Sequence, residues 1–306
     1  MGKENRSEKF LKEKSLKISI AEGSAYSVMD GFGLKYISPY AIALNLSNTA
    51  IGLLSSLPAL IGSLVQIPGS RAIEHYPRKK IVLKSVLLQA FMWLPIIVVG
   101  ILYFLFHWNV FSVSVLLIAF YTALVSFGAF AGPAWSSWMK DLITSNTDYY
   151  FGKRNGIIGA VGLISLLAAG LTLQYFEKSN VLLGFSLIFL MAFLGRVLSA
   201  YFFKKKYEPK ISLQPDYYFN IFQFTKKMGK NNFGKFVIFS SVITFATAVA
   251  SPFFAVYMLK DLNFNYLSYT IVTVASVASM LLFMPLWGKF GDKYGNVKTM
   301  HLTGAL

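Results

Sequence analysis

The sequence predicts an all-α protein that crosses a membrane many times. Hydrophobic residues make up 55% of the chain and charged residues only 14%, and the mean hydropathy is +0.55. Apolar runs of about 20 residues, the length that a helix needs to cross the hydrocarbon of a bilayer, recur along the chain. A soluble domain of 306 residues carries more charge than this. The fold class that we predict is therefore an all-α polytopic membrane protein.

The net charge of +16 does not indicate a nucleic-acid partner here. The lysines and arginines fall in short clusters between apolar runs, which is the pattern that orients a protein in a membrane. The chain has no cysteine, which excludes disulfides, thiol catalysis and cysteine-based metal sites. The three histidines, His75, His107 and His301, are scattered over different turns and predict no metal site. We expect no cofactor, and we expect a monomer in the lipid bilayer.

The chain begins with a basic tail and two apolar spans. Residues 1–19 are polar and lysine-rich and lack the small-residue cleavage site of a signal peptide, so we expect a cytoplasmic tail. The first span, about 20–44, is interrupted by charge and would fail a strict hydropathy test. The second span, about 49–69, follows a polar turn that is short enough to predict a helical hairpin. The charged residues of the first span are Glu22, Asp30 and Lys35.

Four further spans complete a predicted six-helix bundle over residues 20–203. They cover about 81–105, 110–133, 156–175 and 181–203. A polar stretch then runs from 204 to 234, which is long for a loop between compact elements. We interpret it as a cytoplasmic linker between two bundles.

A second, partial bundle is predicted over residues 235–306. It contains two complete spans, about 235–259 and 267–287, and the start of a third. The last apolar run begins near Val297 and has about ten residues when the sequence reaches Leu306, so we expect a chain truncated at its carboxyl end. This makes eight complete spans.

The distribution of lysine and arginine predicts the orientation. Twenty-five of the 29 lie in five segments that alternate with nearly uncharged turns. Because cytoplasmic loops carry the excess of lysine and arginine, both the amino terminus and the linker are predicted to be cytoplasmic, in the cell membrane. The five segments are 1–20, 70–84, 136–154, 204–235 and 288–298.

A basic, glycine-rich turn occurs at residues 288–298, with the sequence GKFGDKYGNVK. A related turn lies 218 residues earlier, in SRAIEHYPRKK, where Glu74 aligns with Asp292 and Ser70 aligns with Gly288. Each turn stands between the second and third span of its bundle. The chain therefore has an internal repeat, with a degenerate first copy.

These turns resemble the loop signature G-x-x-x-D-x-x-G-x-x-K/R of the major facilitator superfamily. The segments GPAWSSWMKDL from Gly132 and YYFGKRN from Tyr149 resemble a prokaryotic group of these transporters, mostly without an assigned substrate. The resemblance implies two six-helix bundles around a central substrate cavity. It also implies secondary active transport of a small solute by alternating access, with protons as a possible coupling ion.

The resemblance further implies that Asp292 takes part in charge pairing that holds the cytoplasmic side closed in one state. A turn-capping acid is the alternative, and for Glu74 it is the preferred one. Asp141 and Arg154 flank the loop before the fifth span and are expected to form an equivalent latch. The candidate gate residues are Glu74, Arg78, Asp141, Arg154, Gly288, Asp292 and Gly295.

Asp30 is the first candidate for substrate or proton coupling. It lies about ten residues into the first span, where a charge is so costly that ionisable side chains usually face a cavity. A carboxylate there suits proton coupling or a cationic substrate. The alternatives are pairing with Lys35 and a helix-capping role beside Gly31 and Gly33. Glu22, nearer the edge, is expected to be solvated.

Arg196, Gln66 and Gln89 are the other candidates. Arg196 lies within the sixth span and either extends toward the lysine cluster at its end or pairs with an acid or an anionic substrate. Gln66 and Gln89 either bridge helices or contact substrate.

Two rival functions remain open at this point. An intramembrane enzyme needs ionisable residues clustered at one membrane depth, and the chain has few and shows no nucleophile motif. A transporter-like sensor cannot be separated from a carrier by sequence. We expect a transporter that acts on a small-molecule substrate and not an enzyme.

Overall fold

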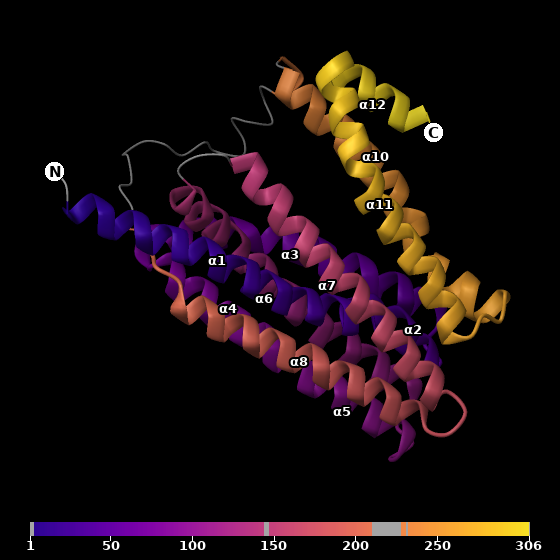
Figure 1. The fold of residues 1–306 in the computed structure, drawn as a ribbon. Coiled ribbons are helices and arrows are strands. Elements are labelled where there is room, and N and C mark those ends of the chain that lie inside the picture. Colours follow the sequence, from indigo (N-terminus) through magenta and orange to yellow (C-terminus); the bar gives the residue numbers. More distant parts are fainter. Residues whose placement is uncertain (1–2, 144–146, 210–227, 231, 306) are drawn as a thin grey trace.

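The computed structural model describes residues 3–143, 147–209, 228–230 and 232–305, and every regular element within them is a helix (Figure 1). This confirms the predicted all-α fold. Residues 210–227, the middle of the predicted linker, lie outside the described residues.

Residues 3–143 and 147–205 form one elongated bundle (Figure 1). Within it α3 packs along α6, while α1 packs along both α7 and α8. Apolar side chains fill the space between these helices in two clusters, one around Trp93 and Phe189 and one around Trp138 and Phe203. The helices of the bundle are α1 (Lys3–Phe32), α2 (Ile37–Ala43), α3 (Asn48–His75), α4 (Arg78–Phe91), α5 (Trp93–Phe104), α6 (Val110–Leu142), α7 (Thr147–Phe176) and α8 (Val181–Lys205).

Helix α1 is longer than the predicted first span. It begins at Lys3, inside the segment that the sequence assigns to a basic tail, and ends at Phe32. A short 3₁₀ turn, η1 (Leu34–Tyr36), then leads into α2. The break falls at Gly33, where a Cβ would overlap the indole ring of Trp93. Glycine at this position lets the end of α1 approach the first residue of α5 closely.

Seven helical segments of the described chain are long and apolar enough to cross a membrane, compared with eight predicted spans. The difference is α1, because its charged residues lower its hydropathy. Glu22 is nevertheless only 2% exposed, since α7 and α8 cover this side of α1. Part of the charge that lowers the hydropathy of α1 is thus buried within protein.

The predicted third span consists of two helices, α4 and α5, that meet at Met92. Proline has no backbone N–H and cannot donate to the fourth residue before it. Pro95 stands in the first turn of α5, where no such donor is required. The proline therefore explains why one apolar run becomes two helices.

The turns at one end of the molecule share the same helix cap. The side-chain oxygen of Asn109 accepts a hydrogen bond from the amide of Ser112 at 2.8 Å, and Asn180 and Asn265 do the same for Leu183 and Ser268. Such caps satisfy amides that have no partner within the helix. We name this the capped end, and the opposite end, where α4 begins and α8 and α11 finish, the basic end.

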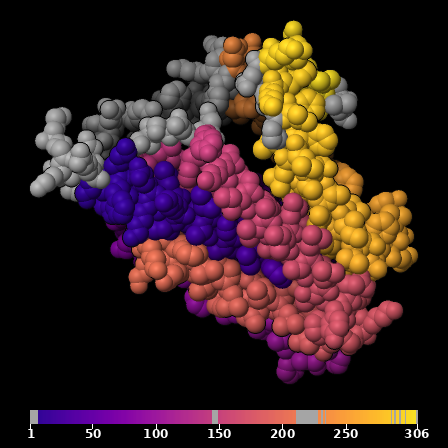
Figure 2. All heavy atoms as spheres, viewed as in Figure 1, coloured from indigo at the N-terminus to yellow at the C-terminus, as the bar shows by residue number. Residues whose placement is uncertain are grey.

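The rest of the described chain forms a second group of helices that meets the bundle near the capped end. Tyr36 Oη lies 2.8 Å from Thr270 Oγ1, and Tyr269 Oη donates to the carbonyl of Lys35 at 3.2 Å. Figures 1 and 2 show α11 against α7 away from the basic end and diverging from it toward that end. The elements of this group are η2 (Met228–Lys230), α10 (Asn232–Val256), the π-helical turn η3 (Tyr257–Asp261), α11 (Tyr266–Tyr294) and α12 (Asn296–Ala305).

Candidate functional site

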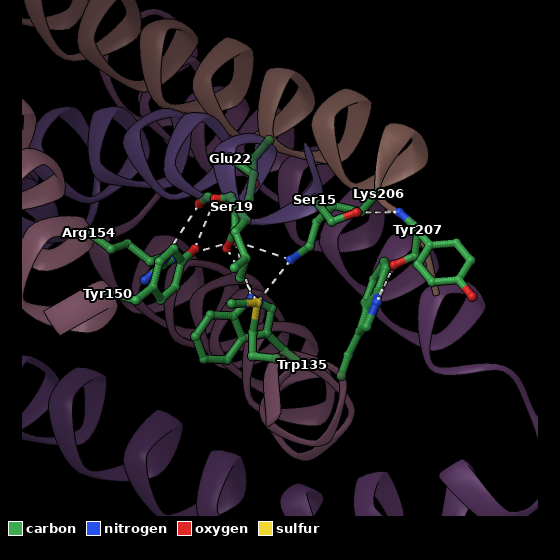
Figure 3. Close-up of polar contacts among 12 residues, drawn as sticks. Ser15, Ser19, Glu22, Trp135, Tyr150, Arg154, Lys206 and Tyr207 are labelled. Carbon is green, nitrogen blue, oxygen red and sulfur yellow. Dashed lines mark hydrogen bonds and ion pairs between the residues drawn. The ribbon is translucent and has the colours of Figure 1, made fainter. Parts of the chain in front are cut away.

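A buried ionic cluster lies inside the bundle near the basic end (Figure 3). Its acid is Glu22 on α1, whose Oε1 lies 3.2 Å from Arg154 Nη2 on α7. The same oxygen accepts hydrogen bonds from Trp135 Nε1 on α6 at 3.2 Å and from Ser19 Oγ at 3.3 Å. The prediction that Glu22 is solvated is therefore wrong. A buried carboxylate is tolerated here because a cation and two further donors surround it.

Lys206, just after α8, adds a second cation to this cluster. Its side chain is fully buried, with Nζ 4.0 Å from Glu22 Oε1 and 4.8 Å from the centre of the Trp138 ring. Burial lowers the pKa of the Lys206 amine to about 8 from its ordinary 10.5, and the charge of Glu22 opposes the shift. The backbone at this point is also held, because the amide of Tyr207 donates to Ser15 Oγ at 2.9 Å (Figure 3).

A cavity of about 370 Å³ opens beside the cluster, between helices α1, α4, α6, α7 and α8. Its walls carry three charged side chains and three aromatic rings, and the rest of the lining is small or apolar. A volume of this order is in the range of sites for small molecules. The charged and aromatic residues of the wall are Glu22, Arg154, Arg196, Tyr26, Trp135 and Phe203.

Arg196 on α8 presents a positive charge to this cavity and forms no ion pair with a carboxylate of the described residues. Its Nε donates to Gln89 Oε1 at 2.7 Å, and its Nη1 donates to Ser199 Oγ at 3.3 Å. The guanidinium also stacks over the Tyr26 ring at 4.9 Å. Its Nη2 makes no hydrogen bond within the described part of the chain. The structure thus brings two predicted candidates, Gln89 and Arg196, together inside the bundle, and the arginine does not extend to the lysine cluster.

Asp30 lies two turns along α1 from Glu22 and outside the lining of the cavity. It is half-buried and interacts electrostatically with Tyr26 and Tyr121. Within the described residues it forms no hydrogen bond or close ion pair, and Lys35, the alternative partner, interacts with it electrostatically at longer range. Gln66 is exposed on α3 and lies apart from this cavity.

The candidate gate residues at the basic end fall into two separate ion pairs. Arg78, at the start of α4, is fully buried, and its Nη1 lies 2.6 Å from Asp141 Oδ2 at the end of α6. Its Nη2 donates to the carbonyl of Pro209 at 2.8 Å, after α8. Asp141 and Arg154, which were expected to form one latch, therefore have different partners, because Arg154 pairs with Glu22.

The other gate candidates make fewer contacts. Glu74 is exposed, and no residue that the structure describes bonds to it. Gly295 ends α11 with a positive φ of 86°, a conformation that favours glycine, and its amide donates to the carbonyl of Gly291 at 2.8 Å. The surroundings of Gly288 and the side chain of Asp292 lie outside the described part of the structure.

Tyr26, Trp135 and Lys206 are site residues that the sequence reasoning missed. One signal for the first of them is present on α1, where Ser15, Ser19, Glu22 and Tyr26 follow one another at steps of four, three and four residues. Residues at this spacing lie on one face of a helix. A face that carries small polar residues and one acid within an apolar run indicates a buried polar interior.

Comparison with known families settles the class of the protein. A model described as Major Facilitator Superfamily matches residues 23–306, which is nearly the whole chain. The chain belongs to the major facilitator superfamily. No curated protein matches the chain. Superfamily members are generally transporters and not enzymes, so the protein is a multi-pass membrane protein of the transporter class.

Proposed function

We propose that the protein is a secondary active transporter that moves a small organic anion by alternating access, coupled to protons. The observation that carries this proposal is the guanidinium of Arg196 on the wall of the cavity, which is 6% exposed and forms no ion pair with any carboxylate that the structure describes. The amino terminus and the basic end lie in the cytoplasm in this proposal, because the lysine and arginine clusters gather there.

The balance of charge in the cavity supports an anionic solute. Glu22 is matched by Arg154 at 3.2 Å, and Lys206 lies near the same carboxylate. Among the described residues, Arg196 forms hydrogen bonds with the neutral partners Gln89 and Ser199, and Glu22 acts on it only at longer range. A charge within the membrane is costly unless it is paired, so a carboxylate on a bound solute would relieve that cost.

The position of Asp30 supports coupling to protons. Both Asp30 and Arg196 interact electrostatically with Tyr26, which lies one turn before Asp30 on α1. When Asp30 is ionised it partly offsets the field of Arg196, and when it is protonated that offset is lost. A proton on Asp30 then favours an anion at Arg196, and by linkage the anion favours the proton.

The contacts between the two groups of helices support alternating access. The hydrogen bonds that join the groups, within the described residues, all lie near the capped end. In this proposal the arrangement is a state that is closed at the capped end, in which α11 diverges from α7 toward the basic end (Figure 1). If one group rocked against the other, the capped end would open and the basic end would close.

Uptake into proteoliposomes tests the proposal, with radiolabelled lactate and benzoate as anionic probes and lactamide and benzamide as neutral matches. We expect the anions to accumulate only when a proton gradient is imposed. Arg196→Gln should reduce anion uptake about tenfold or more, because a charge-assisted hydrogen bond is lost. Asp30→Asn should keep anion exchange and lose the accumulation driven by the gradient.

Arg71→Gln is the matched control, since Arg71 is exposed on α3 and should leave uptake unchanged. Equal uptake of the anions and the neutral amides would contradict the assignment of an anionic solute. Unchanged accumulation and pH dependence in Asp30→Asn would remove proton coupling from the proposal. Binding of the anions without net uptake would indicate a sensor.

A further inference from the structure

A second cavity, unrelated to the ionic cluster, lies between α3, α4 and α6 near the basic end. Its volume is about 520 Å³. Most of its wall is apolar, with Phe127 and Phe130 from α6 and Leu88 from α4. Leu88 is 46% exposed and Phe91, one turn further along α4, is 50% exposed, so the groove opens on an apolar surface of the bundle. Such a surface on a multi-pass protein faces lipid.

Two lysines on α4 give this groove a positive charge. Lys80 and Lys84 are one helical turn apart, both are exposed, and both line the groove. Lys80 Nζ lies 5.7 Å from the centre of the Tyr76 ring at the same site. Neither lysine forms an ion pair within the described residues, and the lining contains no aspartate or glutamate.

The neighbouring basic residues Arg78 and Lys79 contact other parts of the protein, unlike Lys80 and Lys84. Arg78 is buried against Asp141, and Lys79 Nζ donates to the carbonyl of Lys206 at 2.8 Å. These two residues hold the basic end together. Lys80 and Lys84 make no such internal contact and remain available to a ligand.

Two serine hydroxyls also line the groove. Ser126 Oγ on α6 is buried and has no hydrogen-bond partner among the described residues. Ser85 on α4, 5% exposed, also lines the groove. A buried hydroxyl without a partner is costly, and the ester oxygens of a lipid would supply an acceptor at this depth.

We infer that this groove binds an anionic phospholipid. The phosphate lies between the ammonium groups of Lys80 and Lys84, the ester region lies near Ser85 and Ser126, and an acyl chain follows the apolar wall toward Leu88. Basic pockets between membrane helices recognise anionic headgroups in this way. The mainly apolar wall favours a lipid over a free anion, because a free anion would leave that wall uncovered.

Native mass spectrometry of the purified protein tests this site, with phosphatidylglycerol and phosphatidylcholine of identical acyl chains as probes. We expect phosphatidylglycerol to be retained in preference to phosphatidylcholine. The double variant K80Q/K84Q should lower the affinity for phosphatidylglycerol about thirtyfold, since each lysine contributes about 1 kcal/mol. Leu88→Gln should lower retention with both lysines intact, because it makes the acyl-chain path polar.

The matched control is K204Q/K205Q, which removes the same charge from the exposed end of α8 at the same end of the molecule. It should leave the affinity unchanged within about twofold. An equal loss in the control, or equal retention of the two lipids by the unmodified protein, would overturn the proposal. Competition by glycerol 1-phosphate at the same concentration would show a site for soluble anions instead. Unfolding temperatures equal to that of the unmodified protein would show that the variants remain folded.

Discussion

Glu22 joins four parts of the bundle through a single carboxylate. It extends from α1 and binds Trp135 of α6 and Arg154 of α7, while Lys206 approaches it from the end of α8. Removing one member of a buried ionic group leaves the others without compensation, so these residues are coupled energetically. A substitution at any of them changes the packing at the basic end, and a substitution at Glu22, Arg154 or Lys206 also changes the charge of the cluster beside the cavity.

Lys206 makes the free energy of unfolding depend on pH, and the direction of the change follows from the pKa of its amine. The folded protein releases the Lys206 proton near pH 8, whereas the unfolded chain holds it to about 10.5. Between these values the unfolded chain binds more protons, so the free energy of unfolding rises with pH. The Lys206→Met variant has no amine at this position, so its free energy of unfolding does not gain this increase with pH. We expect its stability relative to the unmodified protein to fall by up to about 3 kcal/mol between about pH 8 and pH 10.5.

Thermal unfolding in detergent at several pH values would measure this difference. Lys205→Met is the control, because Lys205 is the exposed neighbour of Lys206 and its substitution should shift Tm by the same amount at every pH. A Lys206→Met difference that is constant from neutral to alkaline pH would show that the amine is not held neutral in the fold.

At the scale of elements, Arg78 connects three segments at the basic end, namely α4, α6 and the residues after α8. It stands at the start of α4, donates to the carbonyl of Ser137 at 3.0 Å and pairs with Asp141 on α6, and reaches Pro209 beyond α8. A guanidinium can make these contacts together because its donors are fixed in one plane, whereas an ammonium is a single point of charge.

Arg78→Lys should therefore loosen the segment after α8 while leaving the ion pair to α6 partly formed. We expect hydrogen exchange at the amide of Tyr207, which donates to Ser15 Oγ, to become about tenfold faster. Arg71→Lys on the exposed surface of α3 is the matched control and should leave this exchange unchanged. Equal exchange rates at the Tyr207 amide in the two variants would mean that Arg78 does not stabilise the segment after α8.

The sequence predicts the helices better than it predicts where they begin and break. Apolar length identifies α3, α6, α7, α8, α10 and α11, because a span must match the thickness of the bilayer. It does not locate the start of α1 at Lys3, since the buried face of that helix is polar and its sequence reads as a tail. The division at Met92 depends on Pro95, whose effect a hydropathy profile does not register.

At the scale of the whole molecule, the two groups of helices are held together at the capped end. The absence of cysteine makes single-cysteine labelling a direct measure of this arrangement. Gly132 lines the cavity, and a side chain introduced there would enter open space, so Gly132→Cys should react readily with a small maleimide. Ala255→Cys, on the buried side of α10, should react slowly.

Tyr36→Phe should then raise the reactivity of Ala255→Cys about fivefold, because a buried hydrogen bond to Thr270 contributes roughly 1 kcal/mol. Tyr40→Phe is the control, since Tyr40 Oη donates to the carbonyl of Ile96 at 2.9 Å within the first bundle. If both variants change the labelling equally, the contact between Tyr36 and Thr270 does not control the separation of the two groups.

The partners within the site could not be deduced from one sequence. Glu22 and Arg154 are 132 residues apart, and Gln89 and Arg196 are 107 apart. The cost of charge in a membrane indicates that Arg196 needs a partner, but which helix supplies it depends on how the bundle packs. The sequence therefore predicts that such residues matter and leaves open which of them meet.

The continuity of α1 has a mechanical consequence. A helix of 30 residues is about 45 Å long at 1.5 Å per residue, and the hydrocarbon layer is about 30 Å thick. Its basic first turns must project into water while its middle is anchored at Glu22. The helix then acts as a lever, and a small tilt at the cavity becomes a wider swing at the amino end. A fluorophore attached there would report the transport cycle from outside the bilayer.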